Sequence, residues 1–195
     1  MIISAIASQD RDKIRSRVLR CGLSESNDKL ATQNAIVVAK IARSDFPAQW
    51  PDLFDNLIEL IKISTQPTSP PKQLSRVLLI SHHVVKELAT VRLQRARMAF
   101  FSVAPQLFAL LWQLYLFRMH EWQGALQNSY SDFSLDVLNK MSDNERILKI
   151  VRRLIAAGYD YPHRDSQVCE VWPTTRAHTE VCCNNLCTIA IADTE

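Results

Sequence analysis

The chain has 195 residues, enough for one ordinary domain, and its 47% apolar and 22% charged residues are usual for a globular protein. Glycine is scarce: three residues (Gly22, Gly124 and Gly158) stand where average usage gives about 14. This scarcity argues against sheets with tight hairpin turns and against the glycine-rich loops that bind nucleotide phosphates. We therefore predict an all-α protein that is not a nucleotide enzyme.

In the first half of the chain, apolar residues recur at helical spacing. The spacing predicts a helix over 9–21, with Gly22 as its terminator, and a second helix over 28–43. Two prolines within Asp45–Pro51 end the second helix and start a third one, which we expect over 51–63. Three helices with sharp turns between them are therefore expected here.

The second half begins with a linker rich in proline and serine at 64–73. A helix is predicted over 73–90, followed by a long helix that extends to about residue 118. We expect 119–141 to be an irregular insertion with a short helix near its end. The capping box Ser142–Glu145 predicts the start of the last helix.

The net charge of +3 is unevenly distributed along the chain. Residues 61–118 carry eight basic side chains and one acidic side chain, whereas residues 119–195 carry seven basic and eleven acidic ones. One interpretation is a helical adaptor whose basic 61–118 block binds RNA or an acidic partner. The other is a set of solvated helix ends and loops.

The uncharged stretch from Met98 to Phe117 is long enough to span a bilayer, which leaves a membrane protein spanning 98–117 as an alternative. Its polar residues Ser102, Gln106 and Gln113 lie on one helical stripe, opposite an apolar stripe. That arrangement favours a buried helix with one wet edge, so we expect no membrane insertion.

Helix pairs of this size suggest a repeat. The first complete pair is expected to start near residue 28, the next near 72, and a third near 142. A spacing of about 44 residues lies in the range of HEAT and armadillo repeats. The predicted fold is therefore an α-solenoid fragment of about three helix pairs, although an unrelated helical bundle can show the same spacing.

No residue set in the sequence predicts catalysis or a metal site. His178 and the three cysteines within 182–187 lack the C-x-x-C spacing of zinc knuckles. The adjacent histidines His82 and His83 point in different directions on a helix and make a poor metal pair. The five cysteines fit reduced thiols in a cytosolic or nuclear compartment. We predict a protein that is not an enzyme and has no cofactor, metal or small-molecule substrate.

One motif is more specific for a protein family than composition or helical spacing is, because it fixes an acidic residue, two prolines and a tryptophan at set spacing in a helix-turn-helix. Its members are Ile41, Ala42, Arg43, Asp45, Pro47, Trp50, Pro51 and Leu53. The motif resembles one in the importin-β (karyopherin-β) family of nuclear transport receptors, and the surrounding sequence looks most like the importin eleven branch. Within the motif, Trp50 and Pro51 are interpreted mainly as architecture.

The resemblance runs from about residue 9 to about 172 and implies a HEAT-repeat segment over 1–172. It implies a receptor that imports protein cargo, shuttles between nucleus and cytoplasm through the nuclear envelope, and binds Ran in its GTP form and nuclear pore proteins. In the family, inner second helices contribute to Ran binding, and the helix at 51–63 is expected in such a place. Its polar face is the implied Ran contact, with a solvated helix face as the alternative: Asp52, Asp55, Asn56 and Glu59.

The sequence departs from the family in two ways. Family members are several times longer, and their first helices are expected to be missing before Ser8. Residues 173–195 have no helical stripe, so we expect a disordered or aberrant tail there.

Overall fold

The structure, a computed structural model, describes residues 7–128 and 135–158, and within them it contains helices and no strand. The helices are α1 (Ser8–Ser24), α2 (Asp28–Asp45), α3 (Leu53–Ser64), α4 (Gln73–Leu88), α5 (Gln94–Asn128) and α6 (Leu135–Gly158). All of them belong to one compact unit that spans residues 1–158. The all-α prediction is confirmed. The expected boundary at 172, the expected tail at 173–195 and the cysteine cluster lie outside the described residues.

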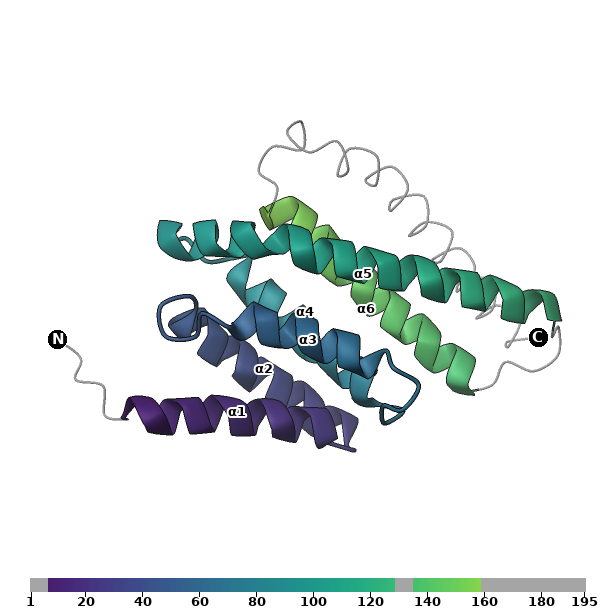
Figure 1. The fold of residues 1–195 in the computed structure, drawn as a ribbon, viewed down its shortest axis with the longest axis horizontal. Coiled ribbons are helices and arrows are strands. Elements are labelled where there is room, and N and C mark those ends of the chain that lie inside the picture. Colours follow the sequence, from purple (N-terminus) through teal and green to yellow (C-terminus); the bar gives the residue numbers. More distant parts are fainter. Residues whose placement is uncertain (1–6, 129–134, 159–195) are drawn as a thin grey trace. The chain divides into compact units, whose positions relative to one another are not determined.

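The helices form two rows. α4 packs most extensively against α2 and also against α6, so that α2, α4 and α6 make one row (Figure 1). In the other row, α1 packs on α2, α3 on α4 and α5 on α6, and α3 also contacts α5. Three successive antiparallel pairs stacked in two layers are typical of a HEAT-like solenoid, which confirms the predicted fold class.

The pairing of the helices differs from the prediction. Pairs starting near 28 and 72 join α2 with α3 and α4 with α5, whereas the structure pairs α1 with α2 and α3 with α4. The small-residue face of α2 is covered by α4, and α3 packs on α4 instead of on α2. Ala35, Ala39 and Ala42 of α2 are at most 1% exposed, and such small side chains let α4 approach α2 closely. Helical spacing in the sequence cannot tell which helix covers such a face.

The expected irregular insertion at 119–141 is wrong for residues 119–128, whereas the helix expected near its end agrees with the start of α6. Residues up to Asn128 continue α5, and α6 begins at Leu135. The capping box therefore lies inside α6. Asp143, within this segment, is buried and pairs with Arg118 of α5 and with Arg146, each at 3.3 Å, so that its carboxylate joins α6 to α5.

Gly22 also has a role other than the expected one. It lies inside α1, which continues to Ser24. A Cβ atom at Gly22 would lie 2.5 Å from Oδ1 of Asn34 on α2 and 3.1 Å from Cδ1 of Ile80 on α4. The absence of a side chain therefore lets α1 approach both neighbouring helices.

Part of α5, Gln94–Glu121, is long and apolar enough to cross a membrane by length and composition alone. A single helix of this kind is weak support for a span, because core helices of soluble proteins have the same character. The expected wet edge is present, since Ser102, Gln106 and Gln113 are all exposed. On the other side, Leu111 and Tyr115 are fully buried, which is how a helix packs in a solenoid core.

Candidate partner-binding surfaces

The turn between α2 and α3 is held by a guanidinium group from α1. Arg15 donates to Oδ2 of Asp45 from Nε at 3.0 Å and from Nη2 at 2.6 Å. Its Nη1 donates to the carbonyl oxygen of Gln49 at 2.5 Å, and its Cζ lies 5.7 Å from the centre of the Trp50 ring. Arg15 is only 5% exposed, so these charge-assisted bonds form away from bulk water.

The other residues of the motif also make internal contacts. Nη1 of Arg43 donates to the carbonyl oxygen of Glu87 at 3.0 Å and to Oγ1 of Thr90 at 2.7 Å, which joins α2 to the end of α4. The hydrogen bond from Lys40 to Glu87 at 2.7 Å lowers the pKa of that carboxyl group. The remaining six motif residues differ in burial: Ala42, Trp50 and Leu53 are buried, while Pro51 is exposed. Ile41 and Pro47 are half-buried, and the Phe46–Pro47 peptide bond is cis.

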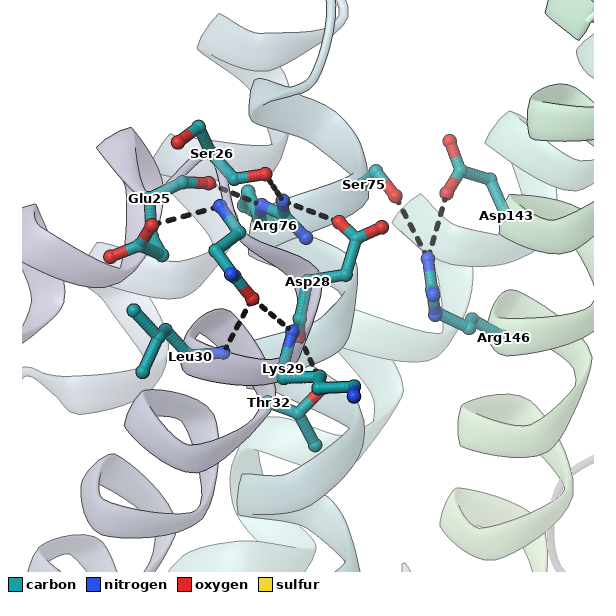
Figure 2. Close-up of polar contacts among 11 residues, drawn as sticks. Glu25, Ser26, Asp28, Lys29, Leu30, Thr32, Ser75, Arg76, Asp143 and Arg146 are labelled. Atoms are coloured by element: carbon teal, nitrogen blue, oxygen red, sulfur yellow. Dashed lines mark hydrogen bonds and ion pairs between the residues drawn. The ribbon is translucent and has the colours of Figure 1, made fainter.

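On one side, α4 is joined to the loop between α1 and α2 (Figure 2). Arg76, which is 4% exposed, donates from Nε to the carbonyl oxygen of Glu25 at 2.8 Å. Its Nη2 donates to the carbonyl oxygen of Ser26 at 3.1 Å and to Oδ1 of Asp28 at 2.6 Å. The hydrogen bond from Arg76 lowers the pKa of Asp28. This arginine therefore fixes the start of α2.

On its other side, α4 is joined to α6. Nη1 of Arg146 donates to Oγ of Ser75 at 2.8 Å and to Oδ1 of Asp143 at 3.3 Å, as Figure 2 shows. Ser75 and Arg76 are neighbours in sequence but contact different helix pairs. Polar groups thus link the three pairs through α4.

The predicted Ran-contact residues lie together on one exposed face of α3, here called the acidic face: Asp52, Asp55, Asn56 and Glu59. Asp52 stands at the N-cap position and accepts a 2.7 Å hydrogen bond from Nδ2 of Asn56. Across the described residues, no lysine or arginine forms a salt bridge with the three carboxylates. The opposite side of α3 is apolar and buried, so the acidic face is the solvent side of the helix.

The position of α3 within its helix pair differs from the expected one. The helix at 51–63 was expected to be the second helix of a pair. In the structure α3 is the first helix of the α3/α4 pair and lies in the row of α1 and α5. The second helices are α2, α4 and α6. The acidic face is therefore a feature of the first-helix row, and its role as a Ran contact stays a prediction.

A second charged surface lies between α4 and α6 and is called the basic face: His82, His83 and Lys86 of α4, and Lys149 and Arg153 of α6. Nη1 of Arg153 lies 3.2 Å from Nδ1 and 3.1 Å from Nε2 of His82. Burial, and then the charge of Arg153, lowers the pKa of His82 to about 4. Burial, and then Lys86, also lowers the pKa of His83. The ring of His82 is therefore neutral at pH 7.

The lowered pKa of His82 predicts an acid-sensitive stability. An unfolded histidine has a pKa near 6.5, so between that pH and about 4 the unfolded chain binds a proton that the folded chain does not. The free energy of unfolding should thus fall by about 1 kcal/mol from pH 7 to pH 5, allowing for the partial exposure of the ring. Urea unfolding at several pH values measures it. The exposed His120 provides the control. His82→Gln should flatten the pH dependence of the stability, and His120→Gln should not. Equal slopes in the wild type and both variants would contradict the assignment of this pH dependence to His82.

The basic 61–118 block does not gather into one surface. Arg76 contacts the loop before α2, Arg118 pairs with Asp143 and Arg97 lies over the ring of Phe101, so at least three of the eight cations of the block make contacts within the chain. Lys62 lies on α3, in the other row from Lys86 on α4. The observed basic face instead combines α4 with α6. In the part of the chain that the structure describes, no three histidine, cysteine or acidic side chains are grouped so that they could hold a metal ion.

The two rows of antiparallel helices define a helical-repeat protein of the HEAT type. No protein-family model matches the chain. The chain is 33% identical over 183 residues to the importin beta-like protein KAP120 of Saccharomyces cerevisiae, which covers 94% of this chain and 17% of that protein. It is 33% identical over 158 residues to kap113 of Schizosaccharomyces pombe, with coverage of 81% and 16%. Human Importin-11 is 29% identical over 164 residues, with coverage of 84% and 16%.

A solved structure gives the same result. Lph2 of S. cerevisiae, described as a bidirectional nuclear transport receptor, matches with a TM-score of 0.74 and 32% identity, over 92% of this chain and 17% of that one. The chain is therefore homologous to the importin-β-like (karyopherin) transport receptors over most of its length, which confirms the resemblance seen in the motif. It spans 16–17% of the length of the curated relatives it matches.

Proposed function

We propose that this chain is part of a nuclear transport receptor that imports protein cargo and shuttles between the cytoplasm and the nucleus. The proposal rests on the identity of 33% that extends over 94% of the chain to an importin beta-like protein. The 1–172 segment is proposed as the HEAT-repeat part. Its mechanism is recognition by helix faces without catalysis, and its partners are Ran in the GTP form, protein cargo and nuclear pore proteins.

Within this function, the acidic face of α3 is the proposed Ran contact. The support is its geometry: three carboxylates are exposed on one side of a helix, and no cation of the described residues forms a salt bridge with them. Such a face attracts a basic partner surface and accepts hydrogen bonds from lysine and arginine. Since the residues do not hold the fold together, they are available for a partner.

Replacing Glu59 by lysine tests this assignment. Affinity for Ran–GTP should fall roughly tenfold, because the substitution removes an attractive charge and adds a repulsive one. The stability should change by less than about 0.5 kcal/mol, since Glu59 is exposed. Isothermal titration of the 195-residue chain with Ran–GTP, and with Ran–GDP for comparison, gives the affinities.

The matched control is Glu121→Lys, which makes the same charge change at an exposed position on α5. If both variants weaken binding equally, the acidic face is not the specific contact. If the folded chain binds Ran–GTP no better than Ran–GDP, the Ran assignment itself is wrong for this segment.

A further inference from the structure

The basic face between α4 and α6 contains three lysine and arginine side chains, and two of them, Lys86 and Arg153, form no ion pair with a carboxylate of the described residues. Three carboxylates of α4 and α6 have side chains that the structure describes, and each of them is already paired with a cation. Glu87 pairs with Lys40 at 2.7 Å and with Arg43 at 3.4 Å. Glu145 pairs with Lys149 at 2.5 Å. Asp143 pairs with Arg118 and Arg146.

Lys86 and Arg153 are therefore left without a carboxylate among the described residues. The polar partner of Arg153 is the ring of His82, and that ring is uncharged at pH 7. A half-buried guanidinium group beside a neutral ring gains little electrostatic compensation from inside the protein. A carboxylate from outside would supply the missing counter-charge and accept two hydrogen bonds from the guanidinium group.

We propose that the basic face binds an acidic, extended segment of a partner protein, rich in aspartate and glutamate. The two cations without a carboxylate lie on adjacent helices, Lys86 on α4 and Arg153 on α6, so a segment lying across α4 and α6 meets positive charge from both. Proteins that bind single-stranded RNA add aromatic side chains that stack on the bases. Histidine and arginine can also stack on bases, but the half-buried ring of His82 is already in contact with Arg153, which favours a peptide over RNA.

This inference goes beyond the proposed Ran contact. It concerns α4 and α6 instead of α3, and the partner surface has the opposite charge. The two assignments therefore succeed or fail separately.

The experiment measures the fluorescence anisotropy of a labelled peptide in which glutamate alternates with serine, titrated with the 195-residue chain at low salt. A peptide with glutamine in place of glutamate controls for charge. We expect binding of the acidic peptide only, with an affinity that falls steeply as salt is added. Comparable binding of the glutamine peptide would overturn the proposal, as would binding of a single-stranded RNA without binding of the acidic peptide.

Matched variants locate the contact. Lys86→Gln and Arg153→Gln should each weaken binding by roughly three- to tenfold. The controls remove the same charges on the other row: Lys62→Gln on α3 and Arg17→Gln on α1, both at exposed positions, should change affinity by less than about twofold. Lys86 is exposed, so its variant keeps the fold even if Arg153→Gln does not. Equal losses in the face variants and the controls would show non-specific attraction and overturn the proposal.

Discussion

Replacing Arg15 by alanine is expected to lower the free energy of unfolding by about 3 kcal/mol. The side chain of Arg15 is 6% exposed and that of its partner Asp45 is 17% exposed, so the substitution leaves a carboxylate mostly out of water and without its cation. The carbonyl oxygen of Gln49 loses a donor at the same time, and Trp50 loses the guanidinium group beside its ring. Urea unfolding of the 195-residue chain, followed by circular dichroism, measures the effect.

Arg17 provides the control for this experiment, because it lies on the same helix but is exposed. Arg17→Ala should change the stability by less than about 0.5 kcal/mol. A double-mutant cycle with Asp45→Asn should give a coupling energy of about 1–3 kcal/mol, since the two side chains are in direct contact. A loss for Arg15→Ala no greater than that for Arg17→Ala would refute the structural role of this pair.

The second large effect is expected for Trp50→Ala, a loss of about 4 kcal/mol. Trp50 is 4% exposed and lies at the junction of α2 and α3, beside the Arg15 side chain from α1. Its removal leaves a cavity. Because the prolines restrict the backbone of the turn, the turn cannot move to fill that cavity. Thermal or urea unfolding measures the loss.

Phe117 makes a suitable comparison for Trp50, because it is also aromatic but is 63% exposed on α5. Phe117→Ala should cost less than about 0.5 kcal/mol. Trp50→Phe should retain part of the stability, because a smaller ring still fills some of the site. If Trp50→Ala is as stable as Phe117→Ala, then the tryptophan of the motif is not part of the architecture.

The positions of the helices follow from the sequence, and their partners do not. Helical spacing of apolar residues predicted helices close to α2, α3 and α4, because each of them has a wide buried side and a polar outer side. The spacing carries no information about which helix covers which side. The contact between Arg15 and Asp45 joins residues 30 positions apart, and helical spacing does not predict a contact at such a separation.

The two charged faces show the same limit. The acidic face was predictable because its residues recur along a single helix, where turns place positions three and four apart on one side. The basic face was missed because it combines α4 with α6. Lys149 and Arg153 come from a stretch of the chain with more acidic than basic residues, so counting charges along the sequence suggested the opposite sign. Surface charge depends on which helices are adjacent, and packing decides that.

The position of α4 has a consequence for how the repeats move. Consecutive residues of this helix, Ser75 and Arg76, hold the pairs on its two sides through arginine hydrogen bonds (Figure 2). A rotation of α4 about its own axis therefore pulls on both neighbours at once. Bending at one junction is mechanically coupled to bending at the next, so the three pairs should flex as one elastic element instead of as independent hinges.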